Sequence, residues 1–253
     1  MEADTFWRHF HEIYEAMPRQ GPGDRGSTLR ALALLPRLTA AQRILDVGCG
    51  SGAQTIDLAQ ATEAQIVAVD IHAPFVAQLA RRAAELGLAE RIRTEVCDMN
   101  DLPFADGSFD VVWSEGAIFV VGFDDGLRAW RRLLVPGGYL VVSDLCWLRD
   151  DPPAELRAFF ESEGADVGVV EERRRVVTGA GYRLVDDFVL PELGWSQNYY
   201  APLEAAVARF REVHEGDAEA LEVAAGCQHE IEMFRKHAGA FGYVFFVMQR
   251  TGA

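Results

Sequence analysis

The stretch from Ile44 to Gly52 constrains the fold of this chain more than any other, because an apolar run leads directly into a cluster of glycines. Residues 43 to 47 begin with Arg43 and are otherwise apolar apart from Asp46, a pattern typical of a buried parallel strand. Helical spacing begins right after the glycines, at residue 53. A strand that passes through a glycine-rich turn into a helix starts a nucleotide-binding βαβ unit, since the ligand approaches bare backbone there.

The spacing of the three glycines separates this turn from two common phosphate-binding loops. In the dinucleotide fingerprint G-x-G-x-x-G, the third glycine comes three residues after the second. Here the pattern is Gly48-x-Gly50-x-Gly52, and the nearby Asp46 carboxylate would repel a pyrophosphate. The P-loop motif is absent, and the only lysine of the chain is Lys236. The turn therefore favours a cationic, phosphate-free nucleoside over NAD.

Further acids come at the ends of the next two expected strands. Residues 66 to 70 form an apolar run that ends in Asp70, about 20 residues past the glycines, where ribose hydroxyls are usually bound. Residues 95 to 99 end a third strand and include Asp98. The carboxyl ends of parallel strands meet at one edge of the sheet, so these acids and Asp46 would repel one another unless a ligand satisfied them.

Five segments in this order resemble the motifs of class I S-adenosylmethionine-dependent methyltransferases. They lie at residues 44–52, 66–70, 95–99, 102–113 and 134–142, within a cofactor-binding core of residues 40–148. The resemblance implies a Rossmann-like α/β fold, with a seven-stranded, mostly parallel sheet, a closing antiparallel strand and helices on both faces. It also implies S-adenosylmethionine as cofactor and S-adenosylhomocysteine as product. The cofactor-binding residues that it implies are Asp46, Gly48, Cys49, Gly50, Gly52, Gln54, Asp70, Ile71, Asp98, Met99 and Ser114.

Ser114 and Glu115 follow the expected fourth strand, where such methyltransferases often bind the acceptor or take its proton. Glu115 is therefore the candidate for orienting the acceptor or for general-base catalysis. A carboxylate that caps the following turn is the structural alternative. Glu115 and Asp144 are both expected near the mouth of the cofactor pocket, and they favour an amine or another cationic acceptor. The expected reaction is SN2 transfer of the sulfonium methyl group.

The chain is expected to form a single domain over residues 1–253. Residues 1–35 are predicted to contain two helices that act as a lid over the cofactor. They are joined by residues 18–24, which contain two prolines and two glycines. Gln20 in this loop is a candidate acceptor-binding residue, although a plain linker fits the loop equally well.

Residues 191–240 are predicted to be a helical insertion between the last two strands. The ordinary fold needs only a short turn at this point, so an insertion of this length is expected to have a function, here as a cap over the acceptor. Aromatic and amide side chains at its start suit a small-molecule pocket. Packing of these side chains against the core is the alternative. The candidate acceptor-binding residues are Trp195, Asn198, Tyr199 and Tyr200.

Composition narrows the partners. A formal net charge of −15 disfavours nucleic acids and acidic membrane surfaces. No apolar run approaches the roughly 20 residues of a membrane helix, and the first residues do not resemble a signal peptide. The four cysteines form no C-x-x-C pair. Together these features favour a cytoplasmic protein. No metal is expected, because His214, His229 and His237 lack ligand spacing. A homodimer is compatible with the sequence.

From end to end the chain resembles a bacterial branch of small-molecule methyltransferases with no settled acceptor. Two rival functions stay open. A non-catalytic protein that binds or senses S-adenosyl ligands would need the same pocket. A nicotinamide oxidoreductase is disfavoured by the glycine spacing and by the closing hairpin. The sequence leaves open the acceptor and whether its nitrogen, oxygen or sulfur is methylated.

Overall fold

The computed structural model describes residues 3–252, and its centre is one eight-stranded sheet. The strands are β1 (Arg43–Val47), β2 (Gln65–Asp70), β3 (Ile92–Val96), β4 (Phe109–Glu115), β5 (Leu134–Trp147), β6 (Gly168–Val169), β7 (Tyr182–Val189) and β8 (Phe241–Arg250). The main path runs β3-β2-β1-β4-β5-β8-β7, and β6 pairs with the end of β5. Neighbouring strands from β3 to β5 are parallel, whereas β8 runs antiparallel to β5 and β7.

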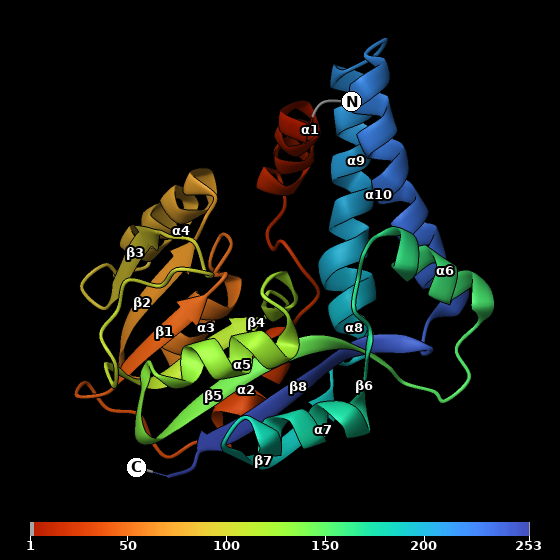
Figure 1. The fold of residues 1–253 in the computed structure, drawn as a ribbon. Helices are drawn as coiled ribbons and strands as arrows, with labels where there is room; N and C mark the ends of the chain where they lie inside the picture. The colour runs from red at the N-terminus through yellow and green to blue at the C-terminus, as the bar shows by residue number, and fades with distance from the viewer. Residues whose placement is uncertain (1–2, 253) are drawn as a thin grey trace.

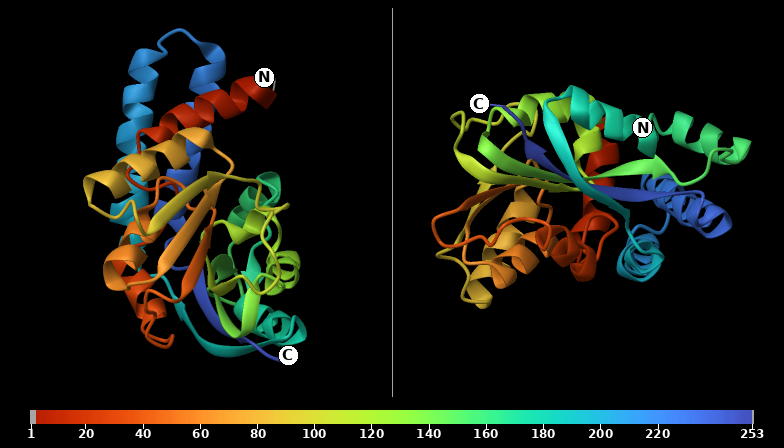
Figure 2. Two further views of the ribbon diagram at one scale, coloured as in Figure 1. Left: turned by 90° about the vertical axis from the view of Figure 1, so that its left-hand side faces the viewer. Right: turned by 90° about the horizontal axis from the view of Figure 1, so that it is seen from below.

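Helices cover both faces of this sheet (Figure 2). They are α1 (Ala3–Glu15), α2 (Arg25–Leu32), α3 (Ala53–Ala61), α4 (Ala73–Glu85), α5 (Phe123–Arg131), α6 (Ala154–Ser162), α7 (Val170–Gly179), α8 (Glu192–Trp195), α9 (Ala201–Val213) and α10 (Ala218–His237). A 3₁₀ turn spans Ile118–Val120 and a π-helical turn spans Ser196–Tyr200. Because α2 to α4 lie on one face and α5 and α7 on the other, the apolar side chains of β1 are buried on both sides.

The first helix and the insertion meet above the carboxyl ends of the strands. In Figure 1, α1 lies beside α9 and α10, which rise together from the edge of the sheet. The contact is anchored at two levels, since His214 Nε2 lies 2.8 Å from Glu12 Oε1 and the hydroxyls of Tyr14 and Tyr199 lie 2.9 Å apart. The two segments predicted as lid and cap therefore form one wall above the sheet edge.

The predicted fold class is confirmed, with two differences in detail. The sheet has an eighth strand, β6, whose two residues are too few to give a sequence pattern. Strand β5 extends past the segment 134–142 to Trp147, where it pairs with β8, and its pairing with β4 shows a register shift between Phe109 and Val111. Residues 1, 2 and 253 of the predicted domain lie outside the described residues. Among residues 3–252, every helix is too short or too polar to cross a membrane.

Candidate active site

The glycine loop wraps tightly over the end of β2. The amides of Gly48 and Cys49 both donate to the carbonyl oxygen of Val69 at 2.9 Å, and the amide of Gly50 donates to Asp70 Oδ2 at 2.9 Å. Gly50 has a φ of +52°, and a Cβ at this position would lie 2.6 Å from Gln20 Oε1. The loop therefore needs glycine here for both its dihedral angle and its close contact.

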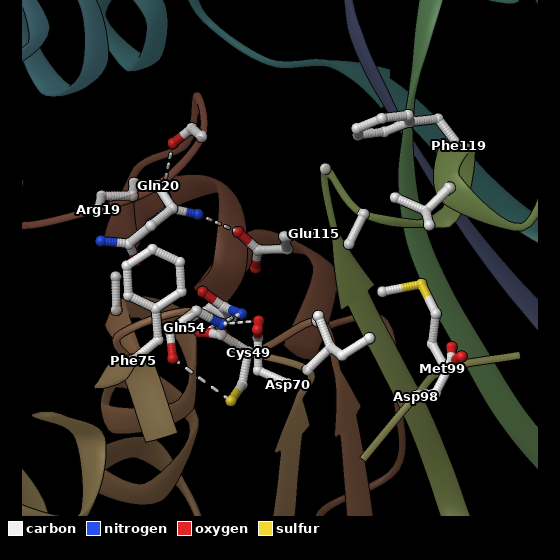
Figure 3. A pocket seen from close by; sticks show the side chains of 18 of the residues that line it. Arg19, Gln20, Cys49, Gln54, Asp70, Phe75, Asp98, Met99, Glu115 and Phe119 are labelled. Atoms are coloured by element: carbon white, nitrogen blue, oxygen red, sulfur yellow. Dashed lines mark hydrogen bonds and ion pairs between the residues drawn. The ribbon is translucent and has the colours of Figure 1, made fainter. Parts of the chain in front are cut away.

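A cavity of about 300 Å³ opens between this loop and the ends of β2 and β4. Figure 3 shows Arg19, Gln20 and Phe75 on one side of it, and Met99, Asp98 and Phe119 on the other. Most of the predicted cofactor-binding residues line this cavity, namely Gly48, Cys49, Gly50, Gln54, Asp70, Ile71, Asp98 and Met99. The lining residues that the sequence did not predict are Arg19, Gly21, Ala53, Phe75, Asn100, Gly116, Ala117, Phe119 and Val120.

Three predicted cofactor-binding residues do not line the cavity. Asp46 lies buried beneath the loop, where it accepts hydrogen bonds from Thr55 Oγ1 at 2.5 Å and from Gln54 Nε2 at 3.3 Å. Burial raises the pKa of its carboxyl to about 7. Gly52 precedes α3, and a side chain there would meet Leu79. Ser114 is buried, and its hydroxyl has no hydrogen-bond partner within residues 3–252.

Two of the acids that line the cavity, Asp70 and Asp98, accept hydrogen bonds from backbone amides. Asp70 accepts from the amides of Gly50 and His72, at 2.9 Å each. Asp98 accepts from the amide and the side chain of Asn100, which lowers the pKa of its exposed carboxyl. Carboxylate oxygens can each accept more than one hydrogen bond, so both residues keep acceptor capacity for hydroxyl or amino groups.

Glu115 also lines the cavity, but its carboxylate is already engaged by three side chains. Arg19 Nη2 lies 2.6 Å from Oε2, while Thr28 Oγ1 and Trp113 Nε1 donate to Oε1 at 2.7 and 2.9 Å. Figure 3 shows the Arg19 contact across the pocket. These bonds tie the segment after α1 to the end of β4. The geometry therefore fits a positioning role for Glu115 better than proton transfer.

Asp144, the other acid expected near the mouth, is paired in the same way. It is buried in β5, and its Oδ2 lies 2.9 Å from Arg173 Nε. Burial raises the pKa of Asp144 to about 6, against the opposing effect of Arg173. Glu115 and Asp144, the two acids from which the sequence analysis expected a cationic acceptor, thus each have an arginine partner. They provide no free negative charge for such an acceptor.

The segment before α2 is fastened to the glycine loop. Gln20 Oε1 accepts from the amide of Ser51 at 2.7 Å, and Gln20 Nε2 donates to the carbonyls of Tyr14 and Met17. The side chain of Gln20 therefore links the end of α1 to the loop beneath it. The segment predicted as a lid lies closed over this side of the cavity.

A second cavity, of about 390 Å³, adjoins the first on the side of α1 and the insertion. Gln20, Gly21, Gly116 and Phe119 line both cavities. We call this second cavity the acceptor chamber. The predicted acceptor residues that line it are Gln20, Trp195, Tyr199 and Tyr200. Asn198 does not line it, because its side chain points to the carbonyl of Gly23, to which it donates at 3.0 Å.

Three charged residues line the chamber, Glu163, Asp166 and Glu230, and the sequence analysis predicted none of them; Glu230 in α10 is the least exposed of the three. Tyr200 donates to its Oε1 at 3.0 Å and Tyr199 at 3.5 Å. Glu230 is half-buried in the wall of the chamber, and loss of water around its carboxyl raises its pKa to about 7. In the sequence Glu230 lies between His229 and Ile231, a context no different from that of a surface glutamate, so no pattern indicated its place in the chamber.

One cluster away from both cavities bears on the prediction of no metal. His9, Glu12 and His214 lie at the junction of α1 and α9, with one ligand atom of each within 4.8 Å of the others. Glu12 already pairs with His214, so these two side chains satisfy each other without an ion. The absence of a metal stays a prediction.

The glycine loop at the carboxyl edge of the parallel strands, together with the antiparallel strand β8, gives the fold that the resemblance to class I methyltransferases implies. Residues 44–138 match the family described as the methyltransferase domain. Residues 44–138 of the chain therefore carry a methyltransferase domain, as the resemblance predicted.

Relatives extend this match. The chain is 30% identical over 146 residues to phosphoethanolamine N-methyltransferase 1 of Arabidopsis thaliana, which covers 57% of this chain and 29% of that protein. It is 35% identical over 132 residues to 27-O-demethylrifamycin SV methyltransferase of Amycolatopsis mediterranei, with coverage of 52% and 47%. The matched region thus spans less than half of either relative.

Solved structures agree in fold over nearly the whole chain. A methyltransferase from Geobacter sulfurreducens, in complex with S-adenosylhomocysteine, has a TM-score of 0.82 at 23% identity and covers 95% of this chain and 97% of its own. One from Thiobacillus denitrificans, with the same ligand, has a TM-score of 0.81 at 20% identity, with coverage of 95% and 97%. At 95% coverage these matches include most of the insertion of residues 191–240.

Proposed function

We propose that this protein transfers the methyl group of S-adenosylmethionine to a small-molecule acceptor by SN2 displacement. The observation that carries this proposal is the junction of the two cavities. Gln20, Gly21, Gly116 and Phe119 line both, so a donor beside the glycine loop and an acceptor in the chamber would meet there. Holding two reactants in line in this way can supply up to about 7–11 kcal/mol of the barrier.

The residues of the first cavity suit the parts of this donor. Asp70 would accept hydrogen bonds from ribose hydroxyls, and Asp98 from the adenine amine, as the family resemblance implies. Met99 and the 66% exposed Ile71 offer apolar surface for the ring. Bound S-adenosylmethionine supplies a methyl group already activated by its sulfonium charge, so the chain's own residues have mainly to orient the acceptor and exclude water.

The N-terminal segment and the insertion are proposed to orient the acceptor and to exclude water. Residues 1–35 would act as the lid over the donor, and residues 191–240 as the cap that forms the acceptor chamber, around the cofactor-binding core of residues 40–148. Glu115 is proposed to position this lid through Arg19 and Thr28, in place of the general base expected from the sequence. Asn198 would support the same closure through Gly23.

The names of the relatives support a small acceptor. They mention phosphoethanolamine, 27-O-demethylrifamycin SV and geranyl diphosphate, all of them small molecules. We further propose a bacterial, cytoplasmic protein that does not act on nucleic acid, in keeping with the net charge of −15. Association into a homodimer through α1 or the insertion is part of this proposal.

A calorimetric titration with S-adenosylhomocysteine tests the donor site, with NADH as the comparison ligand. The proposal predicts binding of S-adenosylhomocysteine and none of NADH, because the acids at the strand ends repel a pyrophosphate. Binding of NADH alone would overturn it in favour of the oxidoreductase. A non-catalytic sensor would also bind S-adenosylhomocysteine, so it differs only in the absence of turnover.

A further inference from the structure

Glu230 is a carboxylate with no basic partner in a chamber built for a small molecule. Its Oε1 accepts hydrogen bonds from Tyr200 and Tyr199. Its Oε2 has no hydrogen-bond partner or ion pair within residues 3–252, and it stays accessible from the chamber. A buried carboxylate is costly unless a cation or a set of hydrogen bonds compensates it. The free oxygen is thus available to a ligand.

The other charges of the chamber have the same sign. Its lining includes Glu163, Asp166 and Glu230, and no lysine, arginine or histidine. Asp166 is paired with Arg173 at 2.9 Å, and Glu163 is exposed at the rim. Among these three lining acids, Glu230 is therefore the one that is neither exposed at the rim nor paired with a basic side chain. A chamber with this charge disfavours acceptors that carry phosphate or carboxylate groups.

The walls around Glu230 are aromatic. Tyr199 and Tyr200 pack against each other with ring centroids 4.8 Å apart, and Trp195 lies 4.8 Å from Tyr243. Further lining rings come from Phe10, Tyr14, Phe159, Phe160 and Phe241. The faces of aromatic rings attract organic cations, most strongly where water is excluded. Rings and one carboxylate together form a site that suits a positively charged nitrogen.

We propose that the acceptor chamber binds an organic ammonium ion, with Glu230 as its counter-ion and the surrounding tyrosine and tryptophan rings as its walls. This inference rests on the proposed function, because it gives the chemical class of the acceptor. It also restores the cationic acceptor expected from the sequence, through a different residue, since Glu115 and Asp144 are paired with arginines.

The test compares two probes of the same shape, choline and its neutral carbon isostere 3,3-dimethylbutan-1-ol. Each is titrated into the protein saturated with S-adenosylhomocysteine, at a pH above the Glu230 pKa of about 7. We expect choline to bind at least roughly tenfold more tightly, the effect of a desolvated cation on rings and a carboxylate. In Glu230→Gln this preference should fall several-fold, whereas Glu222→Gln, an exposed glutamate of the same helix, should retain it.

A second measurement uses the wild-type protein and so does not depend on the folding of a variant. The charge of choline is permanent, so any change in its preference with pH comes from the protein. Burial raises the pKa values of the phenols and the thiol that face Glu230 far above neutrality; these groups belong to Tyr14, Tyr199, Tyr200, Tyr243 and Cys227. Glu163 faces Glu230 from the rim of the chamber. We therefore expect the preference to weaken as the pH falls through about 7 and Glu230 gains a proton.

Equal binding of the two probes, binding of neither, or a preference that survives in Glu230→Gln would overturn the inference. The binding of S-adenosylhomocysteine is measured in the same samples. Its loss would overturn the proposed function, whereas its retention without a preference for choline would overturn the ammonium inference alone.

Discussion

Arg19 and Glu115 lie 96 positions apart in the chain and form a buried ion pair, with Arg19 Nη2 2.6 Å from Glu115 Oε2. The pair joins the segment after α1 to the end of β4, next to the loop that binds the donor in our proposal. Since the Glu115 carboxylate also accepts from Thr28 and Trp113, it stabilises the closed arrangement of this segment.

Removing the charge of Glu115 should therefore be costly. We expect Glu115→Gln to lower the free energy of unfolding by about 3 kcal/mol, because it leaves Arg19 buried beside a neutral group. Urea unfolding measures this. The matched control is Glu204→Gln, which breaks an exposed pair with Arg235 at the same 2.6 Å and should cost far less, because water screens an exposed pair.

The pH profile of the activity separates positioning from base catalysis. A positioning role predicts that Glu115→Gln lowers the rate and weakens binding of S-adenosylhomocysteine, while the shape of the profile is kept. Loss of the acidic limb of the profile, with binding unchanged, would restore Glu115 as the general base.

Gly50→Ala should separate backbone strain from crowding of the donor site. The new Cβ would combine a φ of +52° with a contact of 2.6 Å to Gln20 Oε1. Gly87→Ala is the control, because Gly87 has a φ of +68° and a Cβ added there would have no neighbouring atom within 4 Å. Both variants should lose about 1–2 kcal/mol of stability. By calorimetry, only Gly50→Ala should also lose tenfold or more in affinity for S-adenosylhomocysteine, and equal affinities would contradict the assignment of the loop.

The buried Asp46 predicts a pH dependence of stability. Its pKa is about 7 in the folded protein against a usual value of 3.8, so folding favours its neutral form. This contribution to stability is complete below about pH 4 and is lost as the pH rises through about 7. Above neutral pH, the free energy of unfolding of Asp46→Asn should thus exceed that of the wild type by at most about 4 kcal/mol. Thermal unfolding measures this difference, which should disappear in acid. A difference independent of pH would contradict the prediction.

Phe119 offers a test of the junction between the two cavities. Its side chain is 55% exposed and lines both of them, so Phe119→Ala should change stability by less than about 1 kcal/mol. With the acceptor identified, we expect its KM to rise several-fold. Val213→Ala, at an exposed position of α9 outside both cavities, serves as the control and should leave KM unchanged. An unchanged KM in Phe119→Ala would place the acceptor elsewhere.

The core of the fold could be predicted from the sequence because its signals are local. The apolar run before Gly48, the glycine spacing and the acids at strand ends all lie within short segments, and their order fixes the sheet edge at which they meet. The two-residue strand β6 lacks such a pattern, since it depends on pairing with Cys146 and Trp147 of β5.

The acceptor side depends on contacts between distant segments, which spacing does not reveal. In the sequence Glu115 looked like an unpaired acid, because its partner Arg19 comes from the N-terminal segment, 96 positions away. In the sequence Glu230 cannot be told apart from the other glutamates of its helix. Only the packing of α10 against the π-helical turn brings it to Tyr199 and Tyr200. Whether a charged side chain is buried can be read only from the three-dimensional structure.

The most direct test of the account is the transfer of an isotope-labelled methyl group from S-adenosylmethionine into a bacterial small-metabolite extract, followed by mass spectrometry. We predict a labelled product that forms together with S-adenosylhomocysteine, and whose mass identifies the acceptor. The Gly50→Ala variant should form much less of it. No label above a control without protein, while S-adenosylhomocysteine still binds, would contradict the assignment of this protein as a methyltransferase acting on small molecules in such an extract and would favour the sensor.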